Sequence, residues 1–210
     1  MRACSVRRIN LRLLLIRHGE TMWNLDGRYQ GHSDTQLSLH GEAQARALAN
    51  RFSASDVVSV VASPLLRAQA TAQIIAARLN LPVTTDNRLM EIAYGQWEGL
   101  QQPEVKQRWP EMLRQWKQTP DQVKFPEGES LSGVQQRVRS FFEHMAEQVG
   151  TVLVVSHDGF ARIAILEMQG KPLSAFREVH VENASVTTFI WEGGRFAIEG
   201  INDVAHLVDP

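Results

Sequence analysis

Residues 11–19 read Leu-Arg-Leu-Leu-Leu-Ile-Arg-His-Gly, a compact apolar run that ends in a polar turn at Arg17 and His18. A nearly continuous apolar run of this length is typical of a strand that is buried on both faces of a parallel sheet. A second run, Thr151-Val-Leu-Val-Val-Ser156, has the same character and ends at His157-Asp158-Gly159. The two runs therefore predict two central strands, each of which presents polar residues at its carboxyl end.

Helical and strand patterns alternate along the rest of the chain. Ser38 is suited to cap a helix over about 39–52, and a buried strand is expected over 57–62. We expect Ser63-Pro64 to supply the N-cap and first residue of an Ala-rich helix that runs to Leu79. The other expected elements are a short strand over 81–84, a helix from Ser130 or Ser132 to about 149, a helix over 160–169, and strands over 185–191 and 195–201 around Gly193-Gly194. This alternation predicts an α/β fold, a three-layer α/β/α sandwich with a mostly parallel central sheet.

The composition favours one domain. The chain has 210 residues, of which 43% are hydrophobic and 21% charged, enough for one sizeable core. We expect an N-terminal extension over 1–10 and a single domain over 11–210. Within that domain, residues 95–128 break the alternation with prolines, glutamines and tryptophans, so we interpret them as an insertion that flanks the active site.

Charge and cysteine content exclude several classes of protein. Lys and Arg total 22 against 23 for Asp and Glu, so no global field draws the chain to nucleic acid or to an anionic membrane. The single cysteine, Cys4, excludes an internal disulfide framework and a multi-cysteine zinc site. The sequence also carries no signal-peptide pattern and no apolar stretch long enough to span a bilayer. We therefore expect a cytoplasmic protein with no nucleic-acid or membrane partner.

Basic side chains follow three of the expected strands. Arg17 and His18 end the first strand, Arg67 lies just beyond the strand over 57–62, and His157 follows the strand that ends at Ser156. Ligand sites of such sheets lie beyond the carboxyl ends of the strands, so these side chains should converge. Guanidinium groups can bind the oxygens of a phosphoryl group in bidentate fashion, with no metal required. A histidine can itself attack phosphorus if a backbone carbonyl holds its other ring nitrogen.

The same residues belong to ordered motifs. The motifs are Leu15-Ile-Arg-His-Gly-Glu-Thr21 with Trp23-Asn24, Ser63-Pro-Leu-Leu-Arg-Ala-Gln-Ala-Thr71, Met90-Glu91, Pro126-Glu-Gly-Glu-Ser130 and Val154-Val-Ser-His157. In order and spacing they resemble the histidine phosphatase superfamily, in its phosphoglycerate-mutase-like branch. The resemblance extends from Leu11 to about Leu207, nearly the whole chain.

The resemblance implies an activity and a role for each residue. It implies a phosphatase without metal or cofactor that hydrolyses small phosphorylated metabolites, as α-ribazole phosphatases and broad-specificity phosphatases do, and it allows a homodimer. His18 becomes the nucleophile that forms a phosphohistidine, and Glu91 the proton donor. The implied phosphate contacts are Arg17, Asn24, Arg67 and His157. The role of Glu91 is chemically reasonable, because a departing alkoxide needs a proton and a carboxyl group in a partly closed pocket has a raised pKa.

Two other activities stay open. A cofactor-dependent phosphoglycerate mutase must shield its phosphohistidine from water, which its relatives achieve with a longer, arginine-bearing insertion. Between Trp97 and Pro126 this chain has only Arg108 and Arg114, so phosphatase is favoured over mutase. A catalytically inactive phosphate-binding module is the remote alternative, since all the core residues are present.

The motifs do not identify the substrate. They do not separate α-ribazole phosphate, phosphoserine and phosphoglycerates. Trp109 and Trp116 either stack on a flat ring of the substrate or pack the insertion against the body. Asp158 stands where many relatives have glycine. It either contacts a cationic or hydroxyl-rich substrate or turns toward the N-terminus of its helix, and the second interpretation is favoured.

Overall fold

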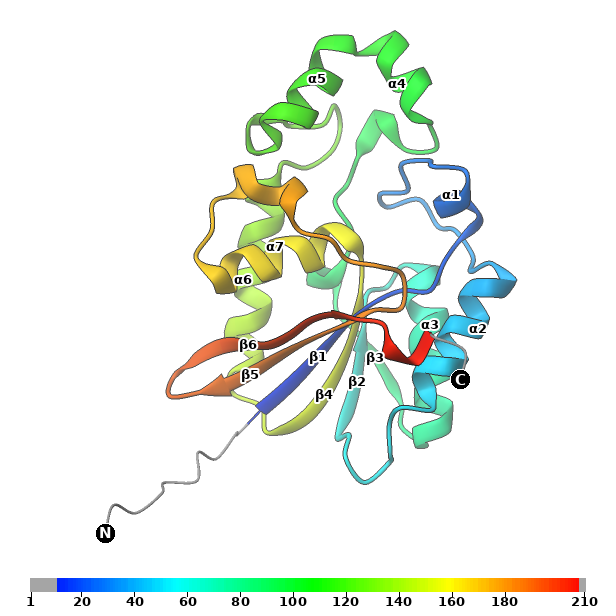
Figure 1. The fold of residues 1–210 in the computed structure, drawn as a ribbon, viewed down its shortest axis with the longest axis vertical. Coiled ribbons are helices and arrows are strands. Elements are labelled where there is room, and N and C mark those ends of the chain that lie inside the picture. Colours follow the sequence, from blue (N-terminus) through cyan, green and yellow to red (C-terminus); the bar gives the residue numbers. More distant parts are fainter. Residues whose placement is uncertain (1–10, 208–210) are drawn as a thin grey trace.

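The computed structural model describes residues 11–207, so the expected extension over 1–10, Cys4 and residues 208–210 lie outside the described part. The strands are β1 (Leu11–Arg17), β2 (Ser59–Ala62), β3 (Val83–Thr85), β4 (Gly150–Ser156), β5 (Val186–Glu192) and β6 (Arg195–Asp203). Over the described residues they form one sheet in the order β3-β2-β4-β1-β5-β6 (Figure 1). Neighbours from β3 to β1 pair in parallel, whereas β5 pairs antiparallel with β1 and β6 antiparallel with β5. The mostly parallel sheet is confirmed.

Helices cover both faces of this sheet. The helices are α1 (Met22–Leu25), α2 (Leu39–Ala49), α3 (Leu66–Leu79), α4 (Gln102–Arg108), α5 (Pro110–Gln118), α6 (Leu131–Met145) and α7 (Asp158–Gln169). Short 3₁₀ segments are η1 (Asn87–Leu89), η2 (Gly95–Trp97), η3 (Pro120–Gln122), η4 (Leu173–Glu178) and η5 (Ala205–Leu207). In Figure 1, α2 and α3 lie on one side of the sheet and α6 and α7 on the other. The expected three-layer sandwich is therefore confirmed.

The two faces carry separate apolar cores, because side chains of a strand point alternately to opposite faces. Along β1, Leu13 and Leu15 belong to the core under α6 and α7. Leu14 and Ile16 belong to the core under α2 and α3. Burial on both faces explains the unbroken apolar run that predicted this strand.

The start of α3 differs from the expectation. We expected Ser63-Pro64 to begin the helix, but it begins at Leu66, and its N-cap residue Leu65 makes no side-chain capping bond. The Ser63 hydroxyl lies 2.7 Å from Nε2 of His157 and accepts a bond from the Leu65 amide instead. The Ser63 hydroxyl therefore forms a hydrogen bond with His157, at a neighbouring strand–helix junction, and does not cap α3.

Residues 95–128 contain two helices that sequence analysis did not predict. Proline stands in the first turn of both α4 and α5, where its missing N–H removes no helical hydrogen bond. Trp116 is buried against Phe125 and Phe176, with ring centroids 5.0 and 5.4 Å away. Of the two roles open to it, Trp116 therefore has the packing role. None of the helices in residues 11–207 is long and apolar enough to cross a membrane.

Candidate active site

A small pocket lies at the carboxyl ends of β1 and β4, where α3 and α7 begin. It has a volume of about 130 Å³. Its lining consists of Arg17, His18, Asn24, Arg28, Tyr29, Gln30, Gly31, Arg67, Glu91, Tyr94 and Asp158. The structure thus brings the predicted site residues together around one cavity, and His157 lies directly beside it against His18. We call this cavity the phosphate pocket.

His18 follows the last residue of β1 and is almost completely buried. Its Nδ1 lies 2.7 Å from the carbonyl oxygen of Gly19. A carbonyl can only accept, so Nδ1 carries the proton and Nε2 keeps its lone pair. Burial, followed by the positive charges of Arg67 and Arg17, holds the pKa of His18 well below its usual value. The ring is therefore neutral at physiological pH, and its Nε2 atom is unprotonated.

Arg67 is the second residue of α3 and is fully buried. Its Nη1 and Nη2 donate to the carbonyls of Ser33 and Gly31 at 2.9 and 2.8 Å. Its Nε donates to Nε2 of His18 at 3.2 Å. Burial lowers the pKa of Arg67 to about 10, so it still carries its charge at neutral pH. The guanidinium is thus fixed in position beside the lone pair of His18.

Arg17 and Asn24 line the pocket from two other segments. Arg17 ends β1, and its Nη1 donates to the Val181 carbonyl at 2.6 Å, while its buried Nε has no hydrogen-bond partner among the described residues. The side-chain oxygen of Asn24 accepts from the backbone and hydroxyl of Thr21, both at 3.0 Å. Since Oδ1 already accepts these two bonds, the side-chain NH₂ of Asn24 is the group that can donate to an anion.

His157 is the N-cap residue of α7 and is fully buried. Its ring packs edge-on against that of His18, with centroids 5.1 Å apart. Nε2 pairs with the Ser63 hydroxyl, whereas the buried Nδ1 has no hydrogen-bond partner within the described residues. Burial, followed by the charge of Arg67, holds the pKa of His157 well below its usual value.

Glu91 lies between η1 and η2 and is 6% exposed. Its Oε1 accepts from the backbone amides of Ile92 and Gly159, each at 2.9 Å. Burial, followed by the negative charge of Asp158, raises the pKa of Glu91. A carboxyl group in this state can hold a proton at a pH where an exposed glutamate has lost it.

Asp158 lines the pocket, which contradicts the favoured expectation that it turns away toward the helix N-terminus. It is the first residue of α7, and its carboxylate lies between two arginines. The Oδ2 atom is 2.8 Å from Nε of Arg162, and Oδ1 is 3.6 Å from Nη1 of Arg17. The carboxylate of Asp158 is thus held at the pocket wall by Arg162, with Arg17 on its other side.

Sequence analysis missed part of the pocket wall. Arg28, Tyr29 and Tyr94 line the pocket, but they lie in loops and carry no periodic or junction signal. It also missed the support behind Glu91. Arg137 of α6 donates to the backbone carbonyls of Met90 and Glu91 at 2.6 and 2.9 Å, which fixes the segment that carries this carboxyl group.

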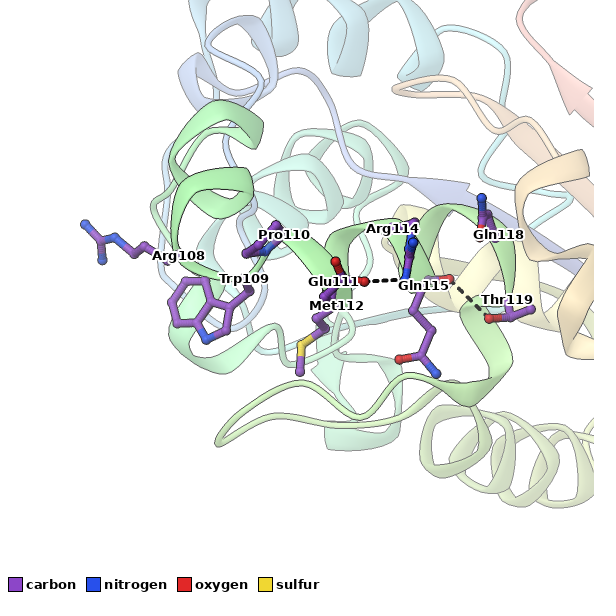
Figure 2. Close-up of a pocket in the computed structure, with 9 residues that line it drawn as sticks. All are labelled: Arg108, Trp109, Pro110, Glu111, Met112, Arg114, Gln115, Gln118 and Thr119. Carbon is purple, nitrogen blue, oxygen red and sulfur yellow. Dashed lines mark hydrogen bonds and ion pairs between the residues drawn. The ribbon is translucent and has the colours of Figure 1, made fainter.

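A second, larger hollow, which we call the outer hollow, is lined by the end of α4 and by residues of α5 and its flanks (Figure 2). It has a volume of about 680 Å³, and its lining shares no residue with that of the phosphate pocket. Arg108 and Arg114, the only arginines of residues 98–125, both line this outer hollow, where their side chains lie apart. Trp109 lines it too, so this tryptophan faces the outer hollow rather than the phosphate pocket.

The pocket joins two neutral histidines, the buried guanidinium of Arg67, the part-buried guanidinium of Arg17 and a carboxyl group, Glu91, whose pKa is raised. Within residues 11–207, no three His, Cys, Asp or Glu side chains gather in an arrangement that could hold a metal ion. Together with the fold, this pocket defines a phosphomonoesterase, an enzyme that cleaves phosphate monoesters. The sequence profile of the histidine phosphatase superfamily (branch 1) matches residues 13–204, and the chain belongs to that superfamily.

Individual relatives agree with this assignment. Phosphoserine phosphatase 1 of Hydrogenobacter thermophilus is 38% identical over 94% of each chain. The protein named probable phosphoglycerate mutase GpmB of Serratia proteamaculans is 34% identical, over 95% of this chain and 96% of its own. The crystal structure of the α-ribazole phosphatase from Shigella flexneri superposes with a TM-score of 0.83 at 30% identity, over 92% of this chain and 96% of its own. The expected family and enzyme class are thus confirmed.

Proposed function

We propose that the chain hydrolyses small phosphomonoesters by transferring the phosphoryl group to Nε2 of His18 and then to water. The observation that carries this proposal is the state of His18: Gly19 holds Nδ1, so Nε2 is unprotonated, and the hydrogen bond that it accepts from Nε of Arg67 is one that a bound phosphoryl group can take over. A neutral imidazole is the form that can attack phosphorus. The depressed pKa of His18 keeps it in that form without a separate base.

The phosphate contacts follow from hydrogen-bonding capacity that the protein leaves unused. Arg17 has a buried Nε without a partner, His157 has a buried Nδ1 without one, and Asn24 has its amide free of the Thr21 contacts. A bound phosphoryl group offers acceptors to all three. Its equatorial oxygens carry the charge of the transition state, which Arg17 and Arg67 stabilise once the Nε–H of Arg67 passes from His18 to the phosphoryl group.

Glu91 is the proposed proton donor. As the bond between phosphorus and the ester oxygen breaks, the bond between phosphorus and Nε2 of His18 forms, and the leaving oxygen takes the proton of Glu91. The resulting carboxylate then removes a proton from water, and that water attacks the phosphohistidine. Inorganic phosphate is released, and both His18 and Glu91 regain their starting states. The raised pKa of Glu91 supports this sequence, because the group has to begin protonated.

Phosphatase activity is favoured over mutase activity, although one relative bears a mutase name. A mutase needs cationic groups that keep the sugar-acid phosphate in the site while it turns. Arg108 and Arg114 line the outer hollow, so Arg28 is the one arginine besides Arg17 and Arg67 in the described lining of the phosphate pocket. An inactive binding module stays the remote alternative. We further propose a cytoplasmic protein with one catalytic domain, and a homodimer stays a prediction.

A panel of phosphomonoesters tests the proposed function. Phosphoserine, α-ribazole phosphate, 3-phosphoglycerate and p-nitrophenyl phosphate are assayed with a chelator present, and 3-phosphoglycerate is also assayed for conversion to 2-phosphoglycerate. We expect phosphate release with kcat/KM well above the rate of isomerisation. Isomerisation faster than phosphate release would identify a mutase, and the absence of both would favour the binding module.

A further inference from the structure

Among the described residues, two acidic side chains line the phosphate pocket, Glu91 and Asp158. The proposed mechanism uses Glu91 but not Asp158. Its Oδ2 pairs with Arg162 at 2.8 Å. Its Oδ1 is buried and accepts no hydrogen bond from the described residues. The nearest cation, Nη1 of Arg17, is 3.6 Å away, which is too far for a hydrogen bond.

An acceptor in this state has capacity for a donor from a ligand. A buried polar atom without a partner is costly, and a bound donor would relieve that cost. Arg17 does not compete strongly for Oδ1 of Asp158 once substrate is bound, because the phosphoryl group then binds the same guanidinium. Oδ1 can therefore still accept a hydrogen bond from the substrate. In the occupied pocket, Oδ1 of Asp158 is therefore the acceptor that still lacks a donor.

The position of Asp158 defines which part of the substrate it meets. Its neighbour in the chain, Gly159, donates its backbone N–H to Oε1 of Glu91 at 2.9 Å. The charge of Asp158 also reaches Glu91 strongly enough to raise the pKa of that group. Since the proposed mechanism has Glu91 protonate the leaving oxygen, we place Asp158 on the leaving-group side of the pocket that both residues line.

The rest of the wall accommodates the negative charges of such a substrate. Arg17 and Arg67 face the phosphate. Arg28, 34% exposed, lines the pocket as well and is anchored through Nη1 to the Gly99 carbonyl at 2.6 Å. A carboxylate on the leaving group can therefore pair with Arg28, which leaves an adjacent ammonium for Asp158.

We propose that Asp158 selects phosphomonoesters with an ammonium group on the second carbon from the ester oxygen, as in O-phosphoserine, over esters with a hydroxyl or a hydrogen there. This inference rests on the proposed function, since it assigns the substrate class of the same site. A charge-assisted hydrogen bond of this kind corresponds to roughly a 10- to 100-fold preference in kcat/KM.

Three esters of identical length test the assignment. O-phospho-L-serine, 3-phospho-L-glycerate and the phosphate ester of 3-hydroxypropionate share the phosphate, the ester linkage and the carboxylate, and they differ in carrying an ammonium, a hydroxyl or a hydrogen. Their kcat/KM values are measured with the wild-type chain, with Asp158→Asn, and with Asp121→Asn as a matched control on the exposed surface of η3. We expect Asp158→Asn to lower the ratio of kcat/KM for phosphoserine to kcat/KM for the hydroxypropionate ester by roughly 10- to 100-fold, and Asp121→Asn to leave this ratio unchanged.

Comparison between esters removes any effect common to all of them. Loss of the contact with Arg162, or a changed pKa of Glu91, slows the three esters together and leaves their ratios intact. Equal losses for the three esters, or an unchanged ratio, would therefore overturn the assignment while the phosphatase stands.

Binding supplies the second readout. If the wild-type chain hydrolyses none of these esters or p-nitrophenyl phosphate, the proposed function fails. Calorimetric titration of the His18→Ala chain with the same three esters, with and without Asp158→Asn, still decides the role of Asp158. We expect the ammonium ester to bind tightest only when Asp158 is present, and equal affinities for the three esters would refute the inference.

Discussion

Replacing Glu91 with glutamine isolates its proton from its other contacts. Oε1 accepts from the amides of Ile92 and Gly159, and the oxygen of a glutamine can keep both bonds. The segment is also held from behind by Arg137, which binds the Glu91 carbonyl. Glu91→Gln should therefore fold normally and lose only the ability to give and take a proton.

The magnitude follows from the leaving group. An alkyl phosphate releases a strongly basic alkoxide, so the loss of the acid should slow its phosphorylation step roughly 10²- to 10⁴-fold, or about 2.7 to 5.4 kcal/mol in activation free energy. p-Nitrophenyl phosphate releases a weakly basic phenolate that needs no proton. Its phosphorylation step should slow much less.

The assay must be a single-turnover rapid quench with enzyme in excess, comparing 3-phosphoglycerate with p-nitrophenyl phosphate. Steady-state rates would hide the contrast, because Glu91 also activates water in the second step. The pH profile gives an independent check. The protonated form of Glu91 is the active one, so kcat/KM for the alkyl ester should fall as pH rises through the raised pKa of Glu91. That alkaline limb should be absent in Glu91→Gln.

Equal losses for both esters would refute the acid role of Glu91. The search would then turn to Asp158, because Glu98 accepts from the amides of His32 and Tyr94, and Glu20 accepts from the Ser38 hydroxyl. Neither of those glutamates lines the phosphate pocket.

Three further perturbations address the pocket. Arg67→Ala should raise KM and lower kcat for every ester, because the guanidinium is proposed to contact the phosphoryl group in the ground state and in the transition state. Steady-state kinetics measure both constants, and a change in KM alone would contradict this role. Gly159→Ala places a Cβ 2.4 Å from Oε1 of Glu91 and 2.5 Å from Cδ1 of Ile92. It should therefore displace the carboxyl group of Glu91 and slow the phosphorylation step of alkyl esters about 10²-fold. The single-turnover rapid quench measures this rate, and an unchanged rate would contradict the geometry. Chelators should leave steady-state hydrolysis intact, whereas vanadate should inhibit it strongly. Activity that is lost with a chelator and restored by Mg²⁺ would mean that the arginines are not the main source of positive charge.

Most of the fold was predictable because its central strands are buried on both faces. The apolar runs that end at Ile16 and Ser156 match β1 and β4 to within a residue at each end. Helices were predicted less accurately where Pro stands. Pro103 and Pro110 suggested a break in the alternation, yet both stand in the first turn of a helix, where proline is well tolerated.

The core of the site was predictable for a different reason. Arg17, His18 and His157 occupy strand–helix junctions, and the topology brings such junctions together. Ser63 shows the limit of local reasoning. Its sequence context is that of a helix cap, but its hydroxyl bonds to His157, a residue far along the chain. The orientation of Asp158 escaped prediction likewise, because it depends on Arg17 and Arg162 lying on either side of its carboxylate.

Direct capture of the intermediate tests the central claim that His18 receives the phosphoryl group. The chain is mixed with ³²P-labelled phosphoserine or p-nitrophenyl phosphate, quenched within milliseconds, and digested for peptide mapping. We predict label on the peptide that contains His18, stable in alkali and lost in acid as a phosphoramidate is, and absent from the His18→Ala chain. Label that is stable in acid and lost in alkali would identify an acyl phosphate on a carboxylate and contradict the account.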